Sequence, residues 1–443
     1  MTGSPSGATL VGSLACQRDS FYRKDFETIV LKCDKALKND NYEIELLDTI
    51  LFPEGGGQPS DTGKIEVLGS NRTIIVSLVF RSRLRAVHLV DEYVQPGSKV
   101  RISIDWDRRL DFMQQHTGQH LLSALLENEW GLKTVSWSMG GVPTPKRSQL
   151  GPSDFFNYIE IERKLSKDEV SKLSLLCNRY ITVDPQKIEV IERKLDSTGP
   201  EVDTSKIPDN YDLEKGTLRT IDIGQLDSNP CCGTHLKNTF QIGSIFISPA
   251  QSSVRGSNSR LSFMCGSRVL NYTDSMHSIV NSSKVLLSCG EIDVPQKLKL
   301  QRDANQKSVK REQFWMKQAA GSTAENLIGQ LGGKKKAHLV MDEYGMPSYI
   351  SCLQKELASR ILLRKLDRYL VVLCGRDKAT GAGTVLISSD SCEEIDAVST
   401  KLSKIVSKLK GGTGNKGGKW QGKVTEFGKG EWTTLCQYLC ELY

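Results

Sequence analysis

Two pairs of side chains in this sequence have the type and spacing of metal ligands. His116 and His120 are four residues apart, and so are Cys231 and His235 much further along the chain. On a helix, this spacing places two side chains on one face, which suits two ligands of one metal. Three imidazole nitrogens and one sulfur fit zinc better than magnesium or calcium. We therefore predict that the two pairs converge on a single zinc ion.

The residues around the first pair exclude a zinc protease. Such an enzyme needs a glutamate beside the first histidine as its general base, and Thr117 occupies that place after His116. The sequence also contains no P-loop, no set of kinase motifs and no Gly-x-Ser-x-Gly segment. Nucleotide-driven chemistry therefore has no support.

The first pair must be carried by a helix. Leucine and methionine residues recur at helical intervals after Asp105, and this aspartate is placed to cap the start of that helix. The second pair follows a turn at Pro230. Upstream of the helix, a glycine loop at residues 53–63 lies between segments with strand character.

Strand patterns on both sides of this helix indicate the fold class. Before it, the spacing of the strands suggests a small barrel, and the clearest of them are expected at residues 42–47, 73–80 and 99–104. After it, helical and strand segments alternate, which favours an α+β fold. These segments are a helix at 163–179 and strands at 188–191 and 218–223.

The C-terminal third has a different character. Polar, helix-prone residues 291–330 predict a connecting helix. The segments beyond it predict an α/β unit, with strands at 369–374 and 384–388, a lysine-rich helix at 392–410 and a glycine-rich segment at 411–423. We thus expect a barrel, a zinc-containing α+β core, a helical linker and a C-terminal α/β domain. Their expected bounds are 1–104, 105–280, 281–334 and 335–443.

The composition fits a soluble globular protein with a mild basic bias. The 443 residues have a net charge of +7, which is compatible with a polyanionic partner. There is no apolar run of about 18 residues and no secretory pattern at the N-terminus, so we expect no membrane span and no signal peptide. The 12 scattered cysteines are expected to be reduced thiols, and the cytoplasm is the expected location.

Three segments in this order resemble a known family: EGGGQPSDTG at 54–63, HTGQH at 116–120 and CCGTH at 231–235. They are similar to the editing domain of alanyl-tRNA synthetase, and more closely to the long form of the free-standing AlaX alanyl-tRNA editing proteins. The resemblance spans roughly residues 20–275. The glycine-rich end is similar to that of the synthetase's tRNA-binding domain. A full synthetase is excluded, because its aminoacylation domain would have to precede the editing domain.

The resemblance implies hydrolysis of wrongly charged tRNA(Ala), chiefly Ser-tRNA(Ala), with Gly-tRNA(Ala) as a further candidate. It implies one zinc ion per chain, and the implied ligands are His116, His120, Cys231 and His235. Cys232 departs from the usual glycine of the motif. If it replaced Cys231 as the ligand, the spacing would be Cys-x-x-His; we favour Cys231, which keeps both pairs at the same interval.

Gln58 is the candidate catalytic group. It ends the glycine motif that lies against the active site in the family, and the glycines before it permit close backbone approach. A metal with four protein ligands resembles a closed structural site. We therefore expect zinc chiefly to position the aminoacyl end, while Gln58 or the ribose hydroxyl orients water. The alternative for Gln58 is a turn residue with an exposed amide.

Hydroxyl groups are expected to recognise a serine substrate by hydrogen bonding. Thr134, Ser136 and Ser138 follow the ligand helix and are the substrate-binding candidates, although ordinary strand or turn positions would explain them equally well. Thr117 and Thr234, inside the two ligand motifs, are expected to support the ligands.

The glycine-rich end is a candidate tRNA surface. Lys416 and Lys419 could neutralise phosphates there, and Trp420 could stack on an exposed base. A solvated basic face is the alternative. Arg255 and Arg260 are candidates for contact with the acceptor end of tRNA, as is Arg268, unless they form salt bridges within the scaffold.

The sequence thus predicts a trans-editing deacylase whose partner is tRNA(Ala) mischarged with serine and which needs no membrane. Three alternatives stay open. They are a non-catalytic RNA-binding protein that keeps zinc for stability, a zinc-stabilised protein-interaction scaffold, and a deacylase that acts on Ser-tRNA(Thr). The oligomeric state is not predicted.

Overall fold

The structure is a computed structural model that describes residues 7–37, 40–70, 72–142, 149–194, 217–343, 346–413 and 418–442. The chain forms two units, Met1–Ser282 and Ser283–Tyr443. None of the helices in the described ranges combines the length and apolar character that a membrane-spanning segment needs.

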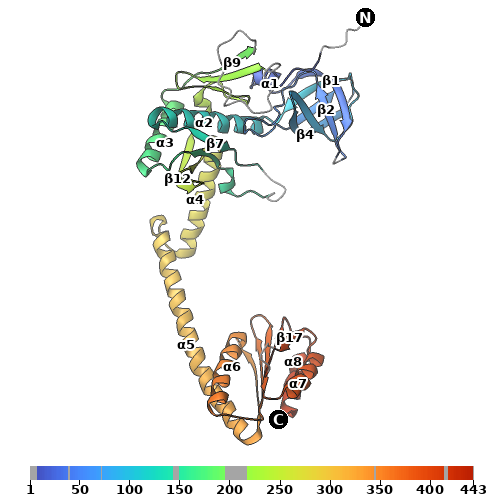
Figure 1. Cartoon of the computed structure of the whole chain (residues 1–443), viewed down its shortest axis with the longest axis vertical. Coiled ribbons are helices and arrows are strands. Elements are labelled where there is room, and N and C mark those ends of the chain that lie inside the picture. The colour runs from blue at the N-terminus through green and yellow to red at the C-terminus, as the bar shows by residue number, and fades with distance from the viewer. Residues whose placement is uncertain are drawn as a thin grey trace. The chain divides into compact units, whose positions relative to one another are not determined.

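The first unit begins with a closed antiparallel barrel of six strands (Figure 1). Around the barrel the order is β1-β2-β5-β4-β3-β6, and pairing of β1 with β6 closes it. Alternate side chains such as Ile74 and Val76 fill the interior, because successive residues of a strand face opposite sides. The strands are β1 (Phe26–Lys35), β2 (Tyr42–Leu46), β3 (Gly63–Val67), β4 (Arg72–Ser82), β5 (Arg85–Val90) and β6 (Lys99–Ile104). The predicted barrel is confirmed.

The first ligand pair lies on helix α2 (Trp106–Trp130), as predicted. The helix begins where the side chain of Asp105 accepts a hydrogen bond from the backbone N–H of Arg108. It ends at Gly131, whose φ of 65° lies in the left-handed region that glycine adopts without strain.

A buried ion pair joins α2 to the glycine loop. The side chains of Arg109 and Asp61 are both 0% exposed. The Arg109 guanidinium also donates to the backbone oxygens of Ser20 and Ile50, at 2.9 and 2.7 Å. His116 follows Arg109 by seven residues, so one face of α2 presents both side chains. The glycine loop, through Asp61, therefore contacts the same face of α2 that carries His116.

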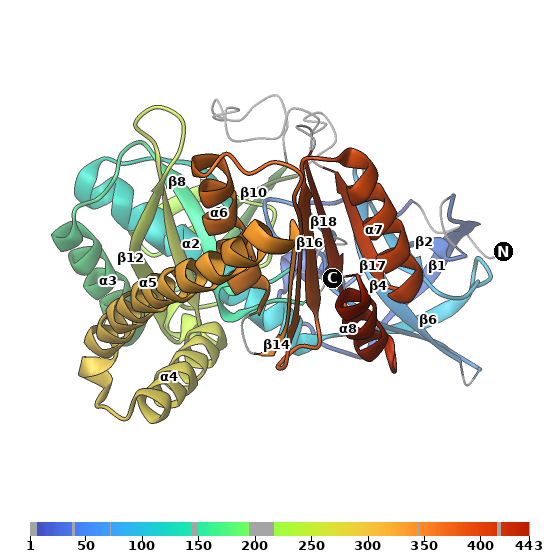
Figure 2. The same ribbon diagram turned by 90° about the horizontal axis from the view of Figure 1, so that it is seen from below.

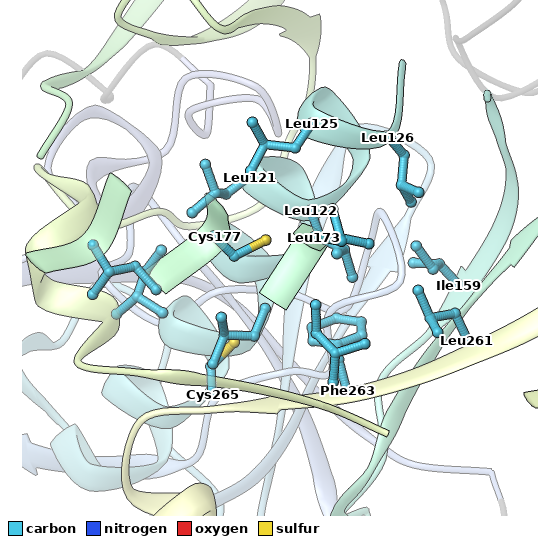
Figure 3. Packing of buried hydrophobic residues seen from close by; sticks show 14 of the residues in the cluster. Leu121, Leu122, Leu125, Leu126, Ile159, Leu173, Cys177, Leu261, Phe263 and Cys265 are labelled. Atoms are coloured by element: carbon cyan, nitrogen blue, oxygen red, sulfur yellow. The ribbon is translucent and has the colours of Figure 1, made fainter. Parts of the chain in front are cut away.

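A four-stranded sheet packs against α2 and the following helix (Figure 3). The strand order is β12-β13-β8-β7. In the core, Leu122 and Leu126 of α2 lie in one cluster with Leu173 and Phe263. The elements of this part are β7 (Thr134–Ser138), η1 (Pro152–Phe155), β8 (Asn157–Ile161), α3 (Lys167–Thr182), η3 (Thr239–Ile242), β12 (Ile245–Ser253) and β13 (Ser259–Cys265).

Helix α3 begins four residues later than the expected start at residue 163. Ser166 is its cap: its hydroxyl accepts from the backbone N–H of Glu169 at 3.2 Å, and the Glu169 carboxylate accepts from the N–H of Ser166 at 2.7 Å. This reciprocal pair fixes the first turn at Lys167.

A second sheet leads into the Cys-containing ligand motif. Its order is β11-β10-β9, and it confirms the strands expected at 188–191 and 218–223. The strands are β9 (Ile188–Lys194), β10 (Thr217–Ile223) and β11 (Asp227–Pro230). Since β11 ends at Pro230, Cys231 follows directly from a hydrogen-bonded strand. The short helix α1 (Ala15–Arg18) precedes the barrel strands in the sequence and contributes Ala15 and Cys16 to the barrel core.

Two helices follow the first unit's sheets. They are α4 (Ser267–Leu287) and α5 (Val294–Lys334), with the short turn η4 (Glu291–Asp293) between them. The connecting helix expected at 291–330 is therefore present as α5. Its last turns, from Ala320 onward, are buried against helix α6 (Met346–Leu363).

The second unit contains a five-stranded sheet with helices on both faces (Figure 2). The order is β14-β15-β16-β18-β17, with β14 and β15 parallel and the other pairs antiparallel. Helices α7 and α8 pack on one face, and α5 and α6 on the other. The remaining elements are β14 (Lys336–Glu343), β15 (Leu370–Asp377), β16 (Gly383–Ser389), α7 (Cys392–Ile405), β17 (Leu409–Thr413), β18 (Lys419–Val424) and α8 (Glu431–Glu441).

The helix expected at 392–410 was predicted too long. Helix α7 ends at Ile405, and Val406 is already extended with φ of −113° and ψ of 104°. Gly411 and Gly412 disfavour a helix, and pairing with β18 satisfies their backbone as strand β17. The lysine pattern alone did not reveal this change of element.

Candidate metal centre

The structure brings the two ligand pairs together, as predicted. Ligand atoms of His116, His120, Cys231 and His235 all lie within 4.8 Å of one another. The sulfur of Cys231 is 3.4 Å from Nε2 of His116 and 3.3 Å from Nε2 of His235. A tetrahedral zinc site with bonds of about 2.0–2.3 Å separates its ligand atoms by about 3.5 Å. The donor set and its spacing therefore fit one tetrahedral metal ion.

The electrostatics at His116, His235 and Cys231 favour the protonation states that bind a metal. Burial lowers the pKa of His116, and burial together with the charge of His116 lowers the pKa of His235 well below its ordinary value. Burial alone would raise the pKa of the Cys231 thiol, but His116 and His235 hold it well below 9.0. Neutral imidazoles and a thiolate are the ligand forms of these residues.

Each histidine also has a partner on its outer nitrogen. Nδ1 of His235 lies 3.3 Å from Oγ1 of Thr117, and Nδ1 of His120 lies 3.4 Å from a carboxylate oxygen of Asp227. Burial lowers the pKa of His120, but hydrogen bonds to Asp227 and Cys231 raise it to about 9. Outer partners of this kind fix the ring orientation of metal-binding histidines.

Gln58 is the outer partner of His116 and is only 1% exposed. Its Oε1 accepts from the backbone N–H of Thr234 at 3.0 Å, and its Nε2 donates to Oγ1 of Thr234 at 2.7 Å. Oε1 also lies 2.9 Å from Nδ1 of His116, which must therefore carry a proton. The lone pair of His116 is then on Nε2, facing the cluster. This geometry favours a positioning residue over a turn residue with an exposed amide.

The glycines of both motifs allow this close packing. Gly56 and Gly57 form a tight turn with φ of 60° and 79°, which places Gln58 opposite Gly55 in a β-bridge. A Cβ atom at Gly233 would lie 2.2 Å from Cε1 of His116. Any larger residue at position 233 would therefore displace a ligand.

Cys231, not Cys232, contributes the sulfur of the described cluster. The thiol of Cys232 faces the glycine loop, where a Cβ atom added to Gly56 would lie 3.6 Å from its sulfur. Its backbone oxygen accepts a hydrogen bond from Nε2 of Gln17 at 2.8 Å.

Arg219 on β10 is a contributor that the sequence analysis missed. Its side chain is almost fully buried, and Nη1 donates to the backbone oxygens of Cys231 and Gly233 at 2.9 and 2.6 Å. Its Nε and Nη2 have no hydrogen-bond partner among the described residues. The guanidinium thus fixes the shape of the loop that presents Cys231. A single arginine within a strand has no sequence feature that would mark it as a contact of the ligand loop.

All three hydroxyl candidates, Thr134, Ser136 and Ser138, lie on β7. Oγ1 of Thr134 is 2.6 Å from Oγ of Ser123, and the exposed Ser136 donates to Glu160 at 3.3 Å. Between Ser136 and Ser138, the ring of Trp137 lies 4.9 Å from the His116 ring. Alternation along the strand turns the two serines to the other face of the sheet. Trp137, which the sequence analysis missed, is therefore the β7 residue in contact with the cluster.

The arginine candidates occupy different environments. Arg255 is exposed in the turn between β12 and β13. Arg260 stacks over the ring of Tyr158 at 4.4 Å. Arg268 is buried and paired with Asp111 at 2.6 Å, so it is a scaffold residue, the alternative considered for these arginines.

Of the three candidates at the glycine-rich end, the structure describes Trp420 and Lys419. The indole of Trp420 is 6% exposed within the core of the second unit, so the prediction that it stacks on a base is wrong. Apolar packing against the sheet and α7 decides its position. Lys419 donates from Nζ to Oε1 of Gln354 at 2.8 Å. Lys416 lies outside the described residues.

Comparison with known proteins agrees with this geometry. A family profile described as "Threonyl and Alanyl tRNA synthetase second additional domain" matches residues 218–262, which include Arg219, Cys231 and His235. A Saccharomyces cerevisiae protein named as an alaX-type alanyl-tRNA editing protein is 49% identical, with 98% of each chain aligned. The mouse alanyl-tRNA editing protein Aarsd1 is 30% identical over 94% of each chain. The chain belongs to the alanyl-tRNA editing proteins.

This membership confirms the resemblance stated from the motifs. A Pyrococcus horikoshii alanyl-tRNA editing protein, AlaX-L, is also 30% identical, over 57% of this chain and 58% of its own. Alanyl-tRNA editing proteins are deacylases that hydrolyse aminoacyl-tRNA ester bonds, and membership places this chain among these enzymes.

Proposed function

We propose that this protein is a trans-editing deacylase that hydrolyses the ester bond of Ser-tRNA(Ala), with Gly-tRNA(Ala) as a second substrate, and that it holds one zinc ion per chain. The observation that carries the proposal is the cluster of His116, His120, Cys231 and His235, assembled from two distant motifs with an oriented ring at each histidine. Membership in the editing family supports the reaction class.

The residues around the cluster have distinct roles in this proposal. A zinc ion held there would chiefly position the aminoacyl end of the tRNA, because four protein ligands leave no open coordination position. Gln58 keeps the proton of His116 on Nδ1 and so orients the ring, which makes it a positioning residue. Trp137 forms an apolar wall beside His116. Of the three hydroxyl candidates, we retain Thr134 for recognising the serine hydroxyl, because it contacts Ser123 of the ligand helix, whereas Ser136 and Ser138 face away from His116.

The macromolecular partner in this proposal is tRNA. The exposed Arg255 and the stacked Arg260 are candidates for contact with the acceptor end, and Lys416 and Lys419 are candidates for phosphate contact in the second unit. The phosphate contacts are expected to make binding depend on salt.

A panel of mischarged tRNAs tests the substrate. Ser-tRNA(Ala), Gly-tRNA(Ala), Ala-tRNA(Ala) and Ser-tRNA(Thr) would be incubated with purified protein, and release of the amino acid would be measured. We expect rapid release from Ser-tRNA(Ala) and slow release from Ala-tRNA(Ala). Preferential hydrolysis of Ser-tRNA(Thr) would replace the proposed substrate, and binding without any hydrolysis would leave a non-catalytic tRNA-binding protein.

Metal analysis tests the zinc assignment on the same samples. We expect about one zinc ion per chain, which four protein ligands would hold tightly. His120→Ala should lose both the zinc and the hydrolysis of Ser-tRNA(Ala). Full activity in a metal-free variant would reject the zinc role.

A further inference from the structure

The first two-thirds of helix α5 form an exposed surface that the deacylase site does not use. Among residues 295–319, Asp303 and Met316 are partly buried and the others are exposed. From Ala320 onward the helix instead packs on α6. Because none of the residues 295–319 is fully buried in the described structure, this part of α5 is available to a binding partner.

One face of this exposed part carries a basic stripe. We define it by four cations separated by two amides, all exposed: Lys299, Arg302, Gln306, Lys310, Gln313 and Lys317. Their intervals of three and four residues place them on a single helix face. At 1.5 Å per residue the stripe is about 27 Å long. Ala320, Ala324 and Leu327 are buried and continue the same face. Their packing on α6 therefore fixes the direction in which the stripe faces around the axis of α5.

The charge of the helix indicates what binds there. Residues 294–319 contain seven Lys and Arg residues and two acidic residues. The only ion pair described for the stripe is the one between Arg302 and its neighbour Asp303, at 3.4 Å. A row of cations without matching carboxylates is complementary to a polyanion, and such cations bind phosphates with release of counterions.

Other occupants fit this face less well. A second copy would bring two rows of like charge together, and the heptad position shared by Leu298, Asn305 and Glu312 is too polar for a coiled-coil seam. A membrane-surface helix needs an apolar face opposite its basic face. The opposite face of α5 mixes Lys297, Lys307 and Arg311 with the exposed apolar Leu300 and Trp315, so it offers no continuous apolar strip.

We propose that the basic stripe of α5 binds the phosphate backbone of tRNA. The identity of the nucleic acid rests on the proposed function. Lysine side chains are mobile point charges, so they track phosphates without reading bases. The stripe thus adds affinity for the body of the tRNA while the metal centre engages the aminoacyl end.

Two triple variants of the full-length protein with the same change in charge test this inference. K299A/K310A/K317A removes three cations of the stripe, and K297A/K307A/R311A removes three from the opposite face. The dissociation constant for uncharged tRNA(Ala) would be measured between 50 and 200 mM salt, with helix content checked by circular dichroism. Uncharged tRNA separates this test from hydrolysis, so failure of the deacylase proposal would not mask it.

We expect the stripe variant to bind tRNA about tenfold more weakly at moderate salt, and its log Kd to depend less steeply on log salt, by up to about 2.7 in slope. The opposite-face variant should bind as the unmodified protein does. Equal weakening in both variants would show a general effect of charge and overturn the stripe. No change in the stripe variant, or a dimer that this variant disrupts, would overturn it as well.

Discussion

Oε1 of Gln58 lies 2.9 Å from Nδ1 of His116, and this contact, together with the Asp61–Arg109 ion pair, joins the glycine loop of the barrel to the ligand helix. The same oxygen accepts from the backbone N–H of Thr234, within the second ligand motif. One buried amide therefore connects the glycine loop with both ligand motifs, and its removal should weaken binding of the metal rather than binding of the substrate.

Gln58→Ala should loosen the His116 ring and weaken metal binding. Loss of an outer partner of a metal-binding histidine lowers metal affinity or activity about 10–100-fold. Metal affinity, measured by competition with a chelator, and deacylation would both be followed. Gln95→Ala is a matched control, because Gln95 is an exposed glutamine of the same unit. Unchanged metal affinity together with lost hydrolysis would instead assign Gln58 a direct role at the reacting water.

The adjacent cysteines allow a test of which sulfur is the ligand. Cys231→Ser should lose most of the bound metal, because the Cys231 sulfur lies within 3.5 Å of two imidazole nitrogens. Cys232→Ser is the matched control and should retain the metal, since the Cys232 thiol faces the glycine loop. Metal content after gel filtration measures both. The reverse result would make Cys232 the ligand.

Arg219→Met should separate metal retention from stability. The variant loses the hydrogen bonds to the backbone oxygens of Cys231 and Gly233, so we expect metal affinity to fall about tenfold. It also removes a buried charge with two unsatisfied nitrogens, so the free energy of unfolding of the metal-free protein should change by less than about 1 kcal/mol. Arg179→Met, at an exposed arginine, is the control. A large loss of stability with intact metal binding would argue for a purely structural arginine.

Asp61→Asn should destabilise the first unit. The substitution leaves the fully buried Arg109 without its carboxylate, and breaking such a pair costs about 3–5 kcal/mol. Glu27→Gln, in the exposed pair with Arg101, should cost less than about 1 kcal/mol. Urea unfolding of both variants gives the comparison, and equal effects would contradict the role assigned to burial.

His88 should make the barrel sensitive to acid. Its side chain is fully buried, and burial lowers its pKa from 6.5 to about 4, against a backbone contact with Ile44. The folded state therefore holds His88 neutral. The contribution of the neutral side chain to the free energy of unfolding is fully present above pH 6.5 and is lost as the pH falls towards 4. The loss amounts to roughly 3 kcal/mol in full.

The measurement is the free energy of unfolding at pH 7 and pH 5. His88→Gln should reduce its pH dependence, whereas His277→Gln, at an exposed histidine, should leave the dependence unchanged. An identical pH dependence in the His88 variant and the unmodified protein would exclude this residue as the cause.

The sequence by itself identified the candidate ligands, the elements that carry them and the fold class. His116, His120, Cys231 and His235 could be chosen because metal coordination restricts both residue type and spacing. The start of the ligand helix could be predicted because Asp105 supplies a local cap. Such signals depend on neighbours in sequence, where hydrogen bonds and periodicity are visible without coordinates.

Only the tertiary structure decided how the ligands are oriented and which nearby residues take part. Arg219, Trp137 and Asp227 reach the cluster through contacts between strands and loops far apart in the chain. Trp420 is a residue that the local pattern misassigned. An aromatic residue beside lysines is equally compatible with base stacking and with a hydrophobic core, and the packing of the second unit placed Trp420 in the core. Long-range contacts set burial and side-chain direction, and neither is encoded in a local pattern.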